Sequence, residues 1–199
     1  MPPTGASGKY ATEAQRHGEQ KATALGDPTD TLRVWTIQHI EAWEPFQRDG
    51  VLKGDGRRIF PEFRPAYHWL KDQMARRIAG YSGGYPVWLW YVPKPDLRSS
   101  GHLPRGASGV RIELEIPRSR ILLMDFQAWH CVLMGQYLAL SSPEDREWGK
   151  REVRHSWERI FDLPALNRSH LWRPVRQIQG VTEYVRMEEV TEIRPFTAR

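Results

Sequence analysis

The sequence has few of the features that mark an exported or membrane-bound protein. Its single cysteine, Cys131, excludes a disulfide within one chain and fits a reducing compartment. It has no run of about 18 apolar residues, the length a membrane-spanning helix needs. The first residues also lack the apolar stretch of a secretory signal. We therefore expect a cytoplasmic protein with no membrane partner.

The sequence also lacks the common patterns of metal and nucleophile chemistry. Its seven histidines do not have zinc-ligand spacing to each other, to the cysteine or to carboxylates, so we expect no metal site. No Gly-x-Ser-x-Gly motif is present. Cys131 lies in an apolar stretch, where a thiol usually acts as a small inert hydrophobic group.

The composition is that of one globular domain. Of the 199 residues, 40% are hydrophobic and nine are tryptophan, which is enough to bury a core without disulfides or metals. Residues 1–30 are poor in large apolar side chains, which predicts a disordered tail before a single domain over 31–199. The net charge of +5 favours anionic partners, such as nucleic acid or a nucleotide pyrophosphate.

The hydrophobic pattern predicts an α+β fold, with a split, mostly antiparallel sheet and flanking helices. Alternating or continuous apolar stretches predict strands at 32–38, 85–92, 110–116, 121–124, 177–185 and 190–196. Helical spacing and caps predict helices at 41–49, 65–78, 126–140 and 142–161. Asp125 is placed to cap the third helix. We expect Trp129, Val132 and Trp157 to be buried.

Aromatic residues on the strand 85–92 allow two interpretations. Trp88 and Trp90 are two positions apart and so face the same side of the sheet, with Tyr91 facing the other. The indoles either pack in the core or form a platform on which a flat ring stacks. Arg98, in the following loop, is either a solvated side chain or a ligand for a pyrophosphate.

Several longer stretches resemble an uncharacterised bacterial family, domain of unknown function 3841. The resemblance extends from Leu32 to Phe196, and the stretches that carry it include LRVWTIQ, YPVWLWY, VRIELEIP and SWERIFDL. It covers essentially the whole predicted domain.

The stretch VWTIQHIEAWEPFQRDGVL is similar, more distantly, to the opening of ADP-ribosyltransferase-like folds of the DarT and RNA 2′-phosphotransferase types. This resemblance implies that NAD is a substrate and that Thr36 and Gln38 hold its nicotinamide ribose and amide. It also implies a late strand that carries the catalytic residue. The candidates for that residue are Gln177, Gln179 and Glu183, of which we favour Gln179 and Glu183.

The resemblance therefore implies an NAD-dependent ADP-ribosyltransferase-like enzyme, and the positive charge and arginine-rich loops make nucleic acid the first candidate acceptor. The alternative is a non-catalytic module that binds nucleic acid or protein. If the enzyme hypothesis holds, one cleft should contain Thr36, Gln38, Trp88 and Arg98, together with Gln179 or Glu183. We expect Trp90 and Tyr91 to complete the cofactor-binding set.

Overall fold

The computed structural model describes residues 30–147 and 152–199, of which Thr31–Arg199 form one compact unit. The predicted tail over 1–30 lies outside the described residues, except for Asp30. No helix in the described ranges is long and apolar enough to cross a membrane.

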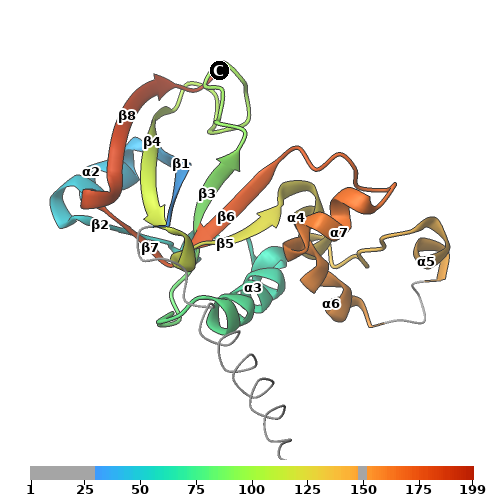
Figure 1. The fold of residues 1–199 in the computed structure, drawn as a ribbon. Helices are drawn as coiled ribbons and strands as arrows, with labels where there is room; N and C mark the ends of the chain where they lie inside the picture. The colour runs from blue at the N-terminus through green and yellow to red at the C-terminus, as the bar shows by residue number, and fades with distance from the viewer. Residues whose placement is uncertain (1–29, 148–151) are drawn as a thin grey trace, which may run out of the picture. The chain divides into compact units, whose positions relative to one another are not determined.

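A six-stranded sheet in the order β5–β6–β3–β1–β4–β8 forms the centre of this unit, and its neighbouring strands pair antiparallel (Figure 1). Its strands are β1 Thr31–His39, β3 Val87–Val92, β4 Ser108–Pro117, β5 Leu122–Asp125, β6 Ile178–Thr182 and β8 Val190–Thr197. A separate antiparallel pair joins β2 Val51–Lys53 to β7 Tyr184–Arg186. The predicted α+β class and antiparallel sheet are confirmed.

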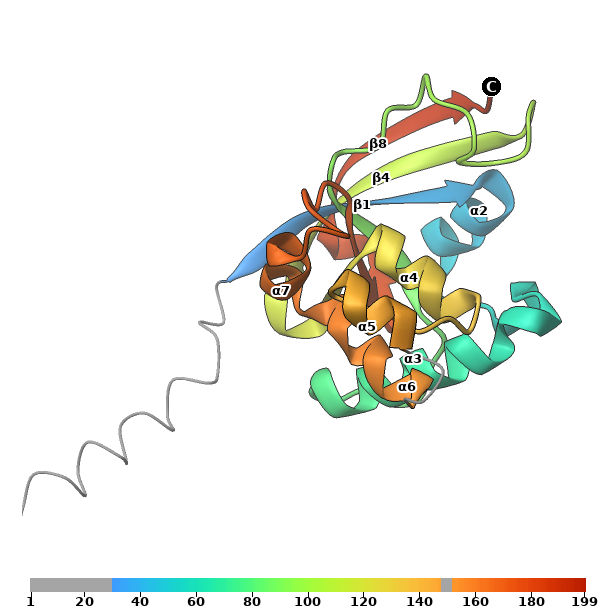
Figure 2. The ribbon, with the colours of Figure 1, turned by 90° about the vertical axis from the view of Figure 1, so that its right-hand side faces the viewer.

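Short helices accompany the sheet. The α-helices are α2 Ile40–Asp49, α3 Arg64–Arg77, α4 Phe126–Leu133, α5 Ser142–Glu147, α6 Val153–Ser156 and α7 Leu163–Arg168. The 3-10 helices are Gly56–Arg58, Pro61–Phe63, Arg118–Arg120, Trp157–Phe161 and Met187–Glu189. Figure 2 shows α3, α4, α6 and α7 grouped together, apart from α2.

The two faces of the sheet pack into separate cores because side chains alternate along each strand. On one face, α3 and α4 pack against Trp88 of β3 and Val181 of β6. On the other, α2 and the β2–β7 pair pack against Leu89 and the apolar residues of β1 and β4. Trp129, Val132 and Trp157 are buried in the first core, as predicted.

Local signals place the ends of the predicted helices 41–49 and 65–78 within one or two residues. The first closes at Gly50, whose φ of 72° is left-handed and whose N–H donates to Phe46 O. The predicted cap of α4 is also confirmed, because Ala128 N donates to Asp125 Oδ1 at 2.7 Å.

The predicted helix 126–140 is wrong beyond Leu133. Gly135 has a φ of 65°, Gly135 N donates to Val132 O, and Gln136 N donates to Cys131 O. These two bonds form a Schellman motif, which ends a helix.

Two further predicted elements are interrupted. The helix 142–161 is described as α5, α6 and a 3-10 helix, with residues 148–151 outside the described ranges. The strand 177–185 breaks at Glu183, where the chain leaves the six-stranded sheet for the β2–β7 pair.

Candidate functional site

The central sheet opens between β1 and β3. Within the described chain, Trp35 opposite Trp90 is the only pair in register between these two strands. Continuing the same register would bring Ile37 opposite Trp88, but both of these residues line a cavity of about 600 Å³. The split of the sheet therefore creates the cavity.

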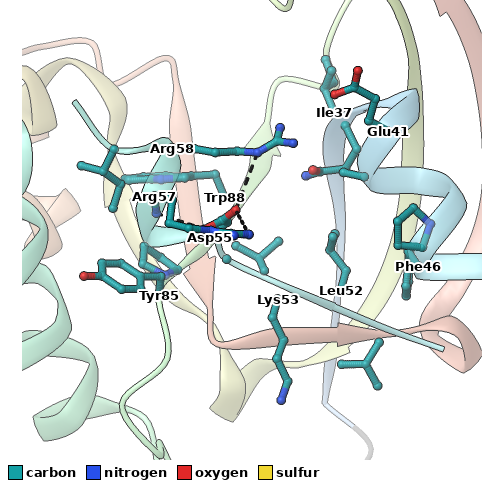
Figure 3. Close-up of a pocket in the computed structure, with 18 of the residues that line it drawn as sticks. Ile37, Glu41, Phe46, Leu52, Lys53, Asp55, Arg57, Arg58, Tyr85 and Trp88 are labelled. Carbon is teal, nitrogen blue, oxygen red and sulfur yellow. Dashed lines mark hydrogen bonds and ion pairs between the residues drawn. The ribbon is translucent and has the colours of Figure 1, made fainter. Parts of the chain in front are cut away.

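The cavity combines flat rings with charged groups from several elements (Figure 3). Its aromatic residues are Phe46, Tyr67, Tyr85, Trp88 and Trp90, and its charged residues are Glu41, Lys53, Asp55, Arg57 and Arg58. Gln38 and His102 add further polar groups. Such a mixture suits a ligand that carries both a planar ring and negative charge.

The aromatic wall is fixed by packing behind it. Trp88 Nε1 donates to Tyr67 Oη at 3.1 Å, and the Trp88 ring lies 5.3 Å from that of Trp129. Trp90 packs against Phe126, with ring centroids 5.2 Å apart. The two interpretations of these indoles are thus compatible, since Trp88 packs against the core with α3 and α4, Trp90 packs against Phe126, and both also line the cavity.

Arg57 and Arg58 form a charged rim at the cavity, and the Arg57 guanidinium is fixed by Asp55. Asp55 caps the 3-10 helix Gly56–Arg58 by accepting from Arg57 N, and it also accepts from Arg57 Nε, both at 3.0 Å. The side-chain hydrogen bond from Arg57 is the main reason that the pKa of Asp55 lies below its usual value. The Arg57 side chain is still 92% exposed, so its outer face is accessible to an anion.

Among the predicted residues, the structure brings Gln38, Trp88 and Trp90 to this cavity. Thr36 does not line it: although Thr36 shares one face of β1 with Gln38, its side chain is buried, at 1% exposed. Thr36 Oγ1 accepts from Gln38 Nε2 at 2.7 Å, so Thr36 orients the Gln38 amide that lines the cavity. Tyr91 lies on the opposite face of β3 from Trp88 and packs in the core with α2.

Arg98 and Gln179 lie elsewhere. Arg98 is outside the lining of the cavity and binds Asp96 through its N–H, Nε and Nη2, the same arrangement that Arg57 makes with Asp55. Gln179 is a buried residue of β6, opposite Trp90 in register. Both residues were predicted to lie in the cleft, and neither lines the cavity.

Glu183 lies beside a second cavity, of about 540 Å³, which shares Lys53, Gly54 and Tyr85 with the first. Its carboxylate is 7% exposed and accepts from Ser82 N, Ser82 Oγ and Gly84 N at 2.9, 2.7 and 2.7 Å. Burial raises the pKa of Glu183, but these hydrogen bonds together outweigh it and lower the pKa. Glu183 therefore fixes the loop 82–84 instead of facing the first cavity.

Sequence reasoning missed the charged rim. The available signal was Asp55-Gly-Arg57 after a short apolar strand, a pattern typical of a capped turn. Its place beside Trp88 depends on the pairing of 51–53 with 184–186, which local patterns do not reveal.

Other reactive groups are sparse in the described part of the chain. It contains no cluster of three or more His, Cys, Asp or Glu residues that could hold a metal ion. Burial raises the pKa of the Cys131 thiol, which disfavours the reactive thiolate.

Comparison with known proteins gives one match. No curated protein and no solved structure shows significant similarity to the chain. One family, described as a domain of unknown function (DUF3841), matches residues 33–151, which is more than half of the sequence and includes β1, β3 and the charged rim. The chain therefore belongs to the DUF3841 family.

Proposed function

We propose that the cavity between β1 and β3 binds NAD and that the domain is an ADP-ribosyltransferase-like enzyme. The observation that supports this proposal is the opening of the sheet, where aromatic rings form one wall and Arg57 and Arg58 form the rim. A nicotinamide or adenine ring can stack on such a wall, and guanidinium groups bind pyrophosphate oxygens. The volume of about 600 Å³ is within the range of small-molecule sites.

The proposed reaction breaks the bond between the nicotinamide nitrogen and the ribose. Nicotinamide leaves with the bonding electron pair, and the ribose carbon then bonds to an acceptor nucleophile, which loses a proton. A carboxylate near the ribose would stabilise the oxocarbenium-like transition state. The cavity is lined by two carboxylates, Glu41 and Asp55, and Asp55 is bound by Arg57. We assign the electrostatic role to Glu41, whose side chain is 72% exposed in the first turn of α2.

Release of labelled nicotinamide from NAD tests the assignment. Glu41→Gln should lower turnover at least tenfold while changing NAD affinity much less, because the charge acts mainly in the transition state (about 1.4 kcal/mol for each tenfold). Glu44→Gln is the matched control, since Glu44 is an exposed residue of the same helix that does not line the cavity. Absence of release from the wild-type protein, or equal turnover of the two variants, would contradict the proposal.

A nucleic-acid-binding module without catalysis is the second candidate function. The net charge of +5 and the exposed arginines of the rim favour it. This candidate predicts binding that weakens steeply with salt and no release of nicotinamide. The same release assay therefore separates the two functions.

A further inference from the structure

An exposed aromatic ring lies next to the cavity. Phe60 is 66% exposed, the highest fraction among the large hydrophobic side chains that the described ranges leave exposed. It belongs to the segment Arg57–Arg64, which reads RRIFPEFR. Arg57, Arg58 and Ile59 of this segment line the cavity. Figure 2 shows the segment in teal at the N-terminal end of α3.

We infer that Arg57–Arg64 binds single-stranded nucleic acid across the mouth of the cavity, with a base stacked on Phe60 and phosphates on the arginines. The assignment of this strand as the acceptor rests on the proposed function. The binding itself does not, because its stacking ring, Phe60, lies outside the cavity lining, although Arg57 and Arg58 would serve both ligands.

The local backbone holds Phe60 in place. It stands in an extended conformation between the 3-10 helices Gly56–Arg58 and Pro61–Phe63. Asp55 caps the first of these helices, and Pro61 starts the second. The edge of the Phe63 ring also supports Phe60, with centroids 6.3 Å apart and an interplanar angle of 83°. A ring held in this way loses little conformational entropy when a base stacks on it.

The charges around Phe60 suit a polyanion. Arg57, Arg58 and Arg64 are exposed, and Arg57 already neutralises Asp55, which leaves Glu62 as the opposing charge of the segment. An aromatic ring between exposed guanidinium groups provides the two contacts that single strands use, stacking and phosphate binding. In a duplex the base faces are stacked on each other, so a duplex would contact the arginines through its phosphates but would not stack on Phe60.

The width of the apolar surface argues against a protein partner. The exposed apolar area is a single ring bordered by arginines, whereas a stable protein interface buries about 800 Å² on each side. Stacking on one ring also carries no base-edge recognition, so binding should tolerate many base sequences.

Fluorescence anisotropy with a labelled oligo(dT) and a duplex of equal length tests the inference. Phe60→Ala should weaken single-strand binding about 5-fold to 100-fold, the usual range for one stacked base, and Phe60→Trp should retain it. Leu171→Ala removes another exposed apolar side chain, outside the segment, and should change nothing. Because Phe60 is exposed, its variants should unfold at the wild-type urea concentration.

The salt dependence gives a second readout. Arg58→Ala should reduce the slope of log affinity against log salt by about 0.7, the value for one lost phosphate contact to a single strand. Arg98→Ala should leave the slope unchanged. Equal affinity for the duplex, or equal effects of Phe60→Ala and Leu171→Ala, would overturn the inference. NAD turnover without strand binding would overturn the single-strand inference and leave the proposed function standing. Strand binding without nicotinamide release would overturn only the proposed function.

Discussion

At the scale of single residues, the Glu183 carboxylate holds the junction between two sheets. The chain leaves β6 at this residue and enters β7, and the carboxylate binds the backbone N–H groups of Ser82 and Gly84. A Cβ at Gly84 would lie 2.9 Å from Glu183 Oε1, which shows how closely the loop approaches it. This contact ties the loop 82–84 to the start of β7, whose partner strand β2 carries Lys53 of the cavity.

Glu183→Ala should therefore lower the free energy of unfolding by about 1.5–3 kcal/mol, because it removes charge-assisted hydrogen bonds from Ser82 and Gly84. Urea denaturation measures this change, and Glu188→Ala, at a 72% exposed side chain, is the control. The conservative variant Glu183→Gln separates structure from catalysis. A loss of NAD turnover in Glu183→Gln at unchanged stability would show that Glu183 acts on the substrate instead.

Trp157 is buried together with Trp69 and Trp129 in the core with α3 and α4. Its ring lies edge-on to Trp69 at 5.5 Å, and its Nε1 donates to Gln136 O at 2.7 Å. Trp157→Ala should cost about 3–5 kcal/mol of stability, as truncation of a buried aromatic usually does. A loss below about 1 kcal/mol in urea denaturation would contradict this assignment of the core.

At the scale of elements, Glu144 joins α5 to the segment before it and to the 3-10 helix Trp157–Phe161. Its carboxylate accepts from Tyr137 Oη at 2.6 Å and from Leu140 N at 2.9 Å, and it pairs with Arg159 at 2.7 Å. Burial raises the pKa of Glu144, but these contacts outweigh it and lower the pKa to about 2.

This shift predicts a pH dependence of stability. Since the folded pKa is below the ordinary value of 4.5, the stabilisation is complete above that pH and is lost as the pH falls towards about 2. Glu144→Gln should therefore lower stability near pH 7 by about 2–3 kcal/mol and flatten the profile between pH 2 and 5. Chemical denaturation across this range measures both effects. A Glu144→Gln profile as steep as that of Glu188→Gln would contradict the prediction.

The sequence predicts the strands better than the segments between them. Alternation is local, so β1, β4 and β8 are found within one or two residues of their ends. The segment after Gly135 is held by distant partners: Ser156 Oγ accepts from Leu138 N, and Trp172 Nε1 donates to Ala139 O. Such contacts satisfy a non-helical backbone, and no local pattern reveals them.

At the scale of the whole compact unit, local sequence patterns also fail to reveal the contacts between distant segments that build the candidate site. Period-two alternation on one aromatic strand identified Trp88 and Trp90, whereas Gln38 and Thr36 came from the resemblance to ADP-ribosyltransferase-like folds. Of these last two, only Gln38 lines the cavity, because Thr36 is buried. Lys53 and Arg57 come to the cavity through the β2–β7 pair, whose strands are far apart in the sequence.

Titration calorimetry of NAD against the wild-type protein, Arg57→Ala and Arg98→Ala measures whether the cavity binds NAD through its arginine rim. The two arginines form equivalent pairs with Asp55 and Asp96, but Arg57 alone of the two lines the cavity. We expect the wild-type protein to bind NAD, Arg57→Ala to weaken binding about tenfold or more through loss of a charge-assisted hydrogen bond, and Arg98→Ala to bind like the wild type. Absence of NAD binding at millimolar concentration, or equal affinities of the two variants, would contradict it.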